Sequence, residues 1–333
     1  MKKTRIISFL TAAVMSVGMT VTAGAFSDMP DGEIGQAMQN AVDAGLINGV
    51  TDDIIAPNDN ITRAQMAAII TRAFSCTEKS AAVFADVKDD AWYADAVSCS
   101  VHMGAFEGDD RNSFNPDNNI TFQETYLVLS RVFGFEPYEV NGTMFKDCDI
   151  SVLDAFVDKD QIVSWAVDGT KYIVGNGGWK GIDGKLKPTD YITRGEFALL
   201  MDSLVDVYID KPGEYNNLEE GLIMVRCDGV KIDNLKSNKN LIVTYGVGDG
   251  GFEIKNSVIN GVTLILGGKD LTPIEQQSSS GNTLKLPDNS YIKLEGNFYD
   301  VRVPVPYIFV NASNAKVKYY NGNPNSLVSL NFG

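Results

Sequence analysis

The chain has 333 residues, of which 44% are hydrophobic and 21% are charged, a composition typical of soluble globular proteins with ordinary cores. Its length allows about two to three domains. The formal net charge of −15 excludes a surface built to hold nucleic acid, because such a surface needs a basic patch.

Residues 1–25 have the pattern of a secretory signal peptide. A basic start precedes an apolar run over residues 6–21, and Ala23-Gly24-Ala25 forms a cleavage pattern, so the mature chain is expected to begin at Phe26. A retained anchor helix is the alternative, but the apolar run is short and ends in small residues. No later stretch is apolar enough to span a bilayer, so we expect an exported protein without a membrane span after cleavage.

One pattern then occurs three times before residue 210, which divides this part into residues 26–78, 79–140 and 141–210 (units 1, 2 and 3). Each unit contains a similar pentapeptide, in the order Ile61-Thr62-Arg63-Ala64-Gln65, Ile120-Thr121-Phe122-Gln123-Glu124 and Ile192-Thr193-Arg194-Gly195-Glu196. Two glycines and a proline precede each pentapeptide at nearly constant spacing: Gly45, Gly49 and Pro57; Gly104, Gly108 and Pro116; Gly177, Gly181 and Pro188.

Each unit is predicted to be a helix, a loop and a second helix. In unit 1, apolar residues from Ile34 to Val42 recur with helical spacing, and Gly45 suits the left-handed residue that follows a helix end. The pentapeptide predicts the start of the second helix, because T-x-x-E/Q is a capping box. One such unit is too small to bury its apolar stripe alone, so the three are expected to share a core.

An aromatic residue and an acid open the units, as Phe26-Ser27-Asp28, Phe84-Ala85-Asp86 and Phe156-Val157-Asp158. The combination of F-x-D, W-x-x-x-A-V, G-x-x-x-G and I-T-R-A-E over residues 26–210 resembles the S-layer homology (SLH) domain. The resemblance implies a pseudo-threefold helical module that binds pyruvylated secondary cell-wall polysaccharide, or in some lineages a modified peptidoglycan. It also implies a protein held on the bacterial cell surface, with self-assembly into a surface layer as a further expectation.

Arg63 and Arg194 are the first candidates for ligand contact. Each occupies the first helical position, where the helix dipole and free N–H groups suit an anion. An arginine fork can pair with a carboxylate through two hydrogen bonds, and a pyruvate ketal offers a carboxylate. Unit 2 has Phe122 at this position and therefore lacks the cation.

Aromatic and glycine positions complete the candidate polysaccharide site. Trp92 and Trp165 either line a groove for a sugar ring or pack in the core, and unit 1 has Glu33 at the equivalent position. Three glycines are turn residues that also allow close approach of a sugar to the backbone: Gly49, Gly108 and Gly181. If each site needs both an arginine and a neighbouring tryptophan, the three sites cannot all be intact, because unit 2 lacks the arginine and unit 1 lacks the tryptophan. We therefore expect one or two working sites rather than three.

The composition changes after a predicted linker at residues 211–220. Residues 221–333 are predicted to form an all-β domain, either a β-solenoid or a β-sandwich. The run from Gly246 to Leu264 resembles the rungs of right-handed β-helices. The expected fold class is thus α+β and multidomain. The strand candidates are Val230–Ile232, Leu241–Tyr245, Phe252–Ile254, Val262–Leu266, Thr283–Leu286, Tyr291–Leu294, Val301–Val303 and Ala315–Tyr319.

Catalytic chemistry is not indicated. His102 is the only histidine, so a histidine-rich metal site is excluded, and no cofactor motif is present. The four cysteines have no zinc-site spacing and are expected to be unpaired or singly paired: Cys76, Cys99, Cys148 and Cys227. We expect a non-enzymatic surface protein. The alternative is an SLH-anchored, polysaccharide-active enzyme with its chemistry on the β-domain.

Overall fold

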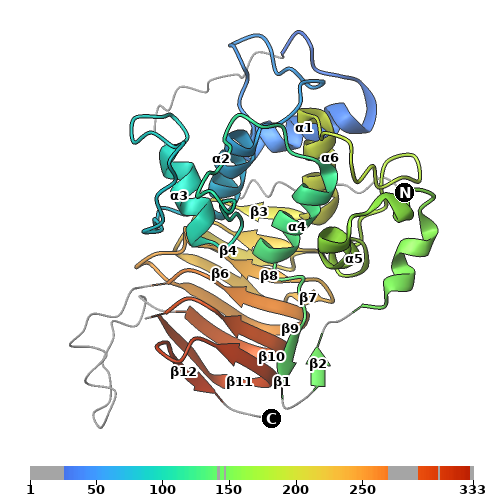
Figure 1. Cartoon of the computed structure of the whole chain (residues 1–333). Helices are drawn as coiled ribbons and strands as arrows, with labels where there is room; N and C mark the ends of the chain where they lie inside the picture. Colours follow the sequence, from blue (N-terminus) through green and yellow to red (C-terminus); the bar gives the residue numbers. More distant parts are fainter. Residues whose placement is uncertain (1–25, 141–142, 146–147, 269–291, 307, 331–333) are drawn as a thin grey trace.

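The computed structural model describes residues 26–140, 143–145, 148–268, 292–306 and 308–330. The predicted signal peptide (1–25) and the strand candidate Thr283–Leu286 lie outside these residues. In Figure 1 the helices gather at one end of the molecule, and the strands form a stack that runs away from them towards the C-terminus.

All three units contain the predicted pair of helices. Unit 1 has α1 (Gly32–Asp43) and α2 (Arg63–Phe74), and unit 2 has α3 (Ala94–His102) and α4 (Phe122–Val132). Unit 3 has α5 (Val167–Gly175) and α6 (Arg194–Leu204). Three 3₁₀ turns precede α5: η1 (Ile150–Ala155), η2 (Lys159–Gln161) and η3 (Ser164–Ala166).

The helix ends agree with the sequence patterns, with one exception. Each second helix begins at the predicted capping box, formed by the threonine and the Gln or Glu of the pentapeptide. Gly45 and Gly104 are left-handed, with φ of 66° and 69°. In unit 3 the left-handed residue is Gly178 (φ 79°) instead of Gly177. Gly177 is needed for a steric reason instead, because a Cβ at this position would lie 2.5 Å from the Ile173 carbonyl oxygen.

The second helix of each unit packs against the first helix of the next unit. The pairs are α2 with α3, α4 with α5, and α6 with α1, so the ring closes (Figure 1). The pentapeptide isoleucines form a closed ring of backbone hydrogen bonds: Ile61 N–H donates to Ile192, Ile192 to Ile120, and Ile120 to Ile61, at 3.0–3.1 Å. All three isoleucines are fully buried. The three units therefore depend on one another for their central contacts.

A short antiparallel hairpin that the sequence interpretation missed spans the boundary between units 2 and 3. Strand β1 (Tyr138–Val140) pairs with β2 (Thr143–Phe145). The two residues between these strands are Asn-Gly, a strong sequence signal for a hairpin.

The remaining strands form a parallel β-solenoid, which decides between the two expected architectures. The strands are β3 (Val207–Ile209), β4 (Gly213–Asn216), β5 (Ile223–Val225), β6 (Val230–Asp233), β7 (Lys236–Ser237), β8 (Leu241–Val243), β9 (Phe252–Ile265), β10 (Ile292–Val303), β11 (Phe309–Gly322) and β12 (Leu327–Leu330). All pairings among them are parallel, as Figure 1 shows for the stacked rungs. The sandwich alternative is wrong, because sandwich sheets are antiparallel.

Matching positions of successive rungs stack on one another. Val230 opposes Phe252, which opposes Ile292, which in turn opposes Val310. All four side chains are buried, so they form one apolar column along the solenoid. Each rung thus buries its inner face against its neighbours and could not do so alone.

Several predicted strands are parts of longer ones. The candidate Phe252–Ile254 lies in β9 and Val262–Leu266 overlaps its end, whereas Tyr291–Leu294 and Val301–Val303 overlap β10. The chain turns a corner at Asn256 inside β9, and at Asn217 and Asn234 directly after β4 and β6. Asn217, Asn234 and Asn256 follow equivalent positions of three rungs, and all are left-handed, with φ of 51–59°. Asparagine tolerates this conformation better than other residues with a Cβ.

The predicted linker is part of the solenoid. Strand β4 lies within residues 211–220 and pairs with β6, and β3 lies still earlier, within the predicted span of unit 3. Of the residues that suggested a linker, Gly213 and Asn216 lie in β4, and Asn217 is the left-handed residue directly after it.

The helices and the solenoid share a hydrophobic core. Met224, Ile242 and Leu264 of the solenoid belong to the same buried cluster as the helical isoleucines. Polar contacts add to this junction: Arg226 Nη2 donates to the Ala44 carbonyl at 2.7 Å, and Arg302 Nη1 donates to the Gly134 carbonyl at 3.0 Å. The two parts are thus packed together rather than tethered.

Candidate functional site

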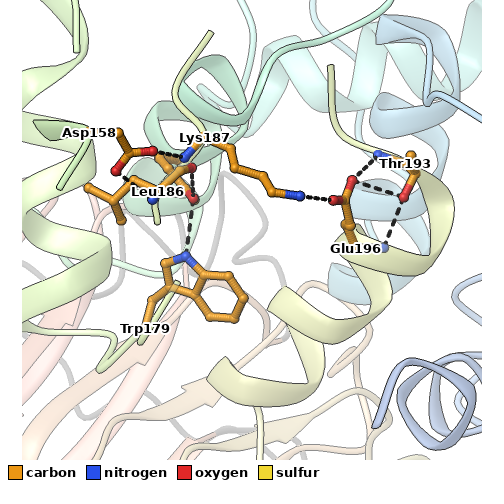
Figure 2. Close-up of polar contacts among 7 residues, drawn as sticks. Asp158, Trp179, Leu186, Lys187, Thr193 and Glu196 are labelled. Atoms are coloured by element: carbon orange, nitrogen blue, oxygen red, sulfur yellow. Dashed lines mark hydrogen bonds and ion pairs between the residues drawn. The ribbon is translucent and has the colours of Figure 1, made fainter. Parts of the chain in front are cut away.

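The acid that opens each unit holds the loop before the pentapeptide. The Asp28 carboxylate accepts from the backbone N–H groups of Ile55 and Ala56, both at 2.8 Å. Asp86 accepts equivalently from Phe114 and Asn115, and Asp158 from Leu186 and Lys187, the last shown in Figure 2. The same contact occurs in all three units, so the aspartate of F-x-D serves to hold this loop in place. We call this pair of hydrogen bonds the aspartate clamp.

The clamped loop contains a left-handed residue directly before the proline. Ala56, Asn115 and Lys187 have φ of 54°, 57° and 52°. The hydrogen bonds from the aspartates go to the N–H groups of these residues, and so stabilise an otherwise unfavourable conformation. The turn brings the proline carbonyl and its neighbours towards the adjacent unit.

The helix N-termini are not open anion sites, which corrects the sequence-based expectation. Arg63 N–H donates to the Asn118 carbonyl, and Ala64 N–H donates to the Pro116 carbonyl, both in unit 2. The next N–H group, of Gln65, donates to Thr62 Oγ1. Equivalent bonds join α4 to the unit 3 loop and α6 to the unit 1 loop. The orphan N–H groups of each helix start are thus used to bind the neighbouring unit.

The two pentapeptide arginines bind the same neighbouring loops through their side chains. Arg63 Nε donates to the Phe114 carbonyl at 2.8 Å, and Arg63 Nη2 donates to the Glu107 carbonyl at 3.3 Å. Arg194 Nε donates to the Ile55 carbonyl at 2.8 Å, and its Nη2 donates to Asn48 at 2.6 Å. Arg63 is partly exposed, whereas Arg194 is buried.

Burial shifts the pKa of both guanidinium groups. Desolvation lowers the pKa of Arg63 and of Arg194, and nearby carboxylates oppose this effect, with Glu124 the strongest at Arg63 and Asp59 at Arg194. The Arg63 guanidinium also lies over the rings of Phe106 and Phe114, 5.0 Å from each centroid. These aromatic faces further stabilise the cation at the boundary between units 1 and 2.

Unit 2 replaces the missing arginine with a tyrosine hydroxyl. Phe122 is buried, and the carbonyl of Leu186 accepts instead from the Tyr126 hydroxyl at 2.7 Å. Trp179 Nε1 donates to the same hydroxyl at 3.1 Å. Burial raises the pKa of the Tyr126 hydroxyl well above its ordinary value. The boundary between units 2 and 3 keeps its structural hydrogen bond but has no guanidinium; the Lys187 ammonium lies 5.9 Å from the centroid of the Phe122 ring instead. Figure 2 shows this region with Trp179 and Lys187.

Trp92 and Trp165 are surface residues. Their exposed fractions are 68% and 54%, which excludes core packing for both. Trp92 contacts Tyr93 edge to face, with 5.3 Å between ring centroids. An exposed tryptophan ring can stack on the apolar face of a sugar ring. The third tryptophan, Trp179, is buried and structural.

The three candidate glycines have a packing role that the sequence interpretation did not identify. A Cβ at Gly49 would lie 2.5 Å from Cε1 of Phe26, and one at Gly108 would lie 2.3 Å from Cε1 of Phe84. At Gly181 the distance to Cε1 of Phe156 would be 2.9 Å. The ring of each F-x-D phenylalanine therefore occupies the space that the glycine leaves open.

A cavity of about 480 Å³ lies where unit 2 meets the solenoid. Its lining includes Phe74, His102, Arg131, Glu136 and Tyr245. His102 Nε2 lies 3.0 Å from a Glu78 carboxylate oxygen. Within the described part of the chain, no three His, Cys, Asp or Glu side chains are arranged to hold a metal ion, and no helix is long and apolar enough to cross a membrane.

Comparison with known proteins supports the repeat assignment for units 1 and 2. The family profile of the S-layer homology domain matches residues 25–67 and 83–125, whereas unit 3 lies outside the match. The surface-layer 125 kDa protein of Lysinibacillus sphaericus is 29% identical over 261 residues, which cover 74% of this chain and 21% of that protein. The S-layer protein EA1 of Bacillus anthracis is 24% identical over 248 residues, covering 68% and 27%.

A cellulosome-anchoring protein of Acetivibrio thermocellus is 27% identical over 186 residues, covering 53% of this chain and 39% of that protein. The chain thus spans between 21% and 39% of the length of these three relatives. The two matches to the S-layer homology profile and the similarity to S-layer proteins indicate a secreted protein of the cell surface.

Proposed function

We propose that units 1 to 3 are three S-layer homology repeats that anchor the protein non-covalently to pyruvylated secondary cell-wall polysaccharide. Unit 3 is included because it has the same aspartate clamp, the same capping box and an equal part in the isoleucine ring. A modified peptidoglycan is the alternative polymer. The solenoid is the displayed part, with a structural, adhesive or surface-layer role.

The single observation that carries this proposal is the pairing of elements across unit boundaries. Arg63 of unit 1 binds the loop of unit 2, and α2 packs against α3, the helix that Trp92 precedes. This boundary therefore combines a partly exposed arginine with an exposed tryptophan. A guanidinium can bind the ketal carboxylate through two hydrogen bonds, and an indole can stack on the sugar ring.

The other two boundaries each lack one of these groups. Arg194 binds the loop of unit 1, which has Glu33 at the tryptophan position. Phe122 faces unit 3, which has Trp165 but no arginine across the boundary. We therefore propose one polysaccharide site, at the boundary of units 1 and 2. The three glycines are left out of it, because phenylalanine rings fill the space beside them.

The two exposed tryptophans provide a matched test. The chain from residue 26 onwards is incubated with purified cell walls, and bound protein is measured by sedimentation. Trp92→Ala should weaken binding at least about tenfold, the loss of one stacking contact and its apolar area, whereas Trp165→Ala should leave binding unchanged. Both side chains are exposed, so neither change should alter the fold. Equal losses in the two variants would contradict a single site at this boundary.

The chemistry of the ligand is tested by removing pyruvate from the walls. Mild acid treatment that releases the ketal should abolish most binding of the wild type, and Arg63→Ala should bind treated and untreated walls equally. Binding that persists after depyruvylation would argue for a modified peptidoglycan. Arg194→Ala is the control for general damage to a unit boundary.

We further propose that the protein has no catalytic activity of its own. A polysaccharide-active enzyme would need paired carboxylates in a cleft. The junction cavity contains one carboxylate in its lining, that of Glu136. Release of reducing sugars from wall polysaccharide by the purified protein, lost on Glu136→Gln, would favour the enzyme instead.

A further inference from the structure

Two buried cysteines lie across the boundary of units 1 and 2. Cys76 follows the end of α2 and is 4% exposed, and Cys99 lies in α3 and is 3% exposed. Side-chain hydrogen bonds on either side of Cys76 join its segment to α3. Thr71 Oγ1 donates to the Ala96 carbonyl at 3.2 Å, and Ser98 Oγ donates to the Ser80 carbonyl at 3.1 Å. The backbone on both sides of Cys76 is therefore fixed against the turn of α3 that carries Cys99.

The structure holds both residues as free cysteines, and each thiol affects the pKa of the other. The remaining cysteines are elsewhere: Cys148 Sγ contacts the Lys171 carbonyl in unit 3, and Cys227 Sγ contacts Ile209 in the solenoid. Export places the protein in a compartment where disulfides persist. We propose that Cys76 and Cys99 form a disulfide that joins unit 1 to unit 2, while Cys148 and Cys227 stay as thiols.

The oxidant is a disulfide of low molecular weight or of a thiol oxidoreductase. One cysteine thiolate attacks this disulfide, forms a mixed disulfide and releases one thiol. The second thiolate then attacks the mixed disulfide, so that the Cys76–Cys99 sulfur–sulfur bond forms and the second thiol leaves. The two cysteines lose two electrons and two protons, which appear in the two thiols of the reduced oxidant.

The folded structure favours bond formation during folding over later oxidation. Burial raises the pKa of the Cys76 thiol to about 12, and it also raises the pKa of Cys99. The reactive thiolate is therefore rare once α2 and α3 have packed. A chain that folds in the presence of oxidant should cross-link, whereas a chain folded under reducing conditions should oxidise slowly.

The pairing is tested by mass spectrometry of the chain from residue 26, refolded with oxidised and reduced glutathione. Free thiols are alkylated before digestion without reductant. We expect a cross-linked peptide pair containing Cys76 and Cys99, and alkylated Cys148 and Cys227. The double variant Cys148→Ser/Cys227→Ser should give the same cross-link. Alkylation of all four cysteines, or any other pairing, would overturn the proposal.

A second measurement asks whether the bond joins the units in the folded state. Reduction should lower the Tm of the wild type by about 5–10 °C, because the closed loop no longer restricts the unfolded chain. Cys76→Ala should have a similarly lowered Tm that reductant does not change further. If reductant leaves the wild-type Tm unaltered, the folded protein does not contain the bond.

Discussion

At the scale of single residues, the repeated side chains of this protein mainly satisfy backbone groups. The aspartates of F-x-D hold two N–H groups each, and Arg63 and Arg194 each hold two carbonyls of the next unit. Tyr126 takes over one of these contacts where the arginine is missing. A repeated polar residue is thus explained first by the fold, and ligand contact is an additional role at an accessible position.

Glu196 gives a pH-dependent prediction at this scale. Burial is the largest single influence and raises its pKa, but hydrogen bonds from Lys187 and Thr193 together outweigh burial, so the net pKa is lowered. Because the folded pKa lies below the unfolded value, the stabilisation is complete above the unfolded pKa and is lost as the pH falls towards the folded pKa. Lys187 Nζ lies 2.7 Å from the carboxylate (Figure 2).

Glu196→Gln should therefore cost about 1 kcal/mol at pH 7 and show a weaker loss of stability between about pH 5 and pH 3 than the wild type. Urea unfolding at a series of pH values measures both effects. Lys187→Met should likewise weaken the pH dependence, because it removes a hydrogen-bond donor from the same carboxylate. A wild-type slope in both variants would show that Glu196 does not contribute.

At the scale of elements, capping boxes and corner residues decide where helices and strands begin and bend. The capping boxes and helix periodicity predicted from sequence the six α-helices found among the described residues, because both signals depend on residues three or four positions apart. The corners of the solenoid were not predicted. A left-handed asparagine inside a continuous ladder is indistinguishable in sequence from one in a loop between two strands.

Asn256 provides the test of this corner. Its φ is 51°, and its Nδ2 donates to Asp233 Oδ1 at 2.8 Å. Asn256→Ala should destabilise the protein by about 1–2 kcal/mol, because alanine is strained in this conformation. Asn260→Ala is a matched control, since Asn260 makes a 2.8 Å bond to Asn238 without a left-handed backbone. Thermal unfolding measures the difference, and equal effects would assign the cost to the side-chain bond alone.

At the scale of the whole molecule, the helical units and the solenoid form one packed body. Leu264 in β9 is buried in the cluster that also contains the helical residues, and a Cβ at Gly134 would lie 3.3 Å from it. The linker expected from sequence is absorbed into the first rung. Unfolding of the two parts should therefore be coupled.

Leu264→Ala tests the coupling. All three tryptophans lie in the helical units, so their fluorescence reports only on that part. The substitution should lower the stability measured by tryptophan fluorescence by about 2–4 kcal/mol, although it lies in the solenoid. Val317→Ala, buried in the separate solenoid core, should have a smaller effect on this signal. An unchanged tryptophan transition in Leu264→Ala would mean that the two parts unfold independently.

The sequence by itself determined the elements that depend on near neighbours in the chain: the repeats, the capped helices and the β-rich C-terminal part. Tertiary structure decided which unit faces which. The pentapeptide alone does not show that Arg63 reaches into unit 2, that helix-start N–H groups are filled by the next loop, or that a phenylalanine ring covers Gly108. These contacts join residues far apart in sequence, and their geometry arises only when the three units close into a ring.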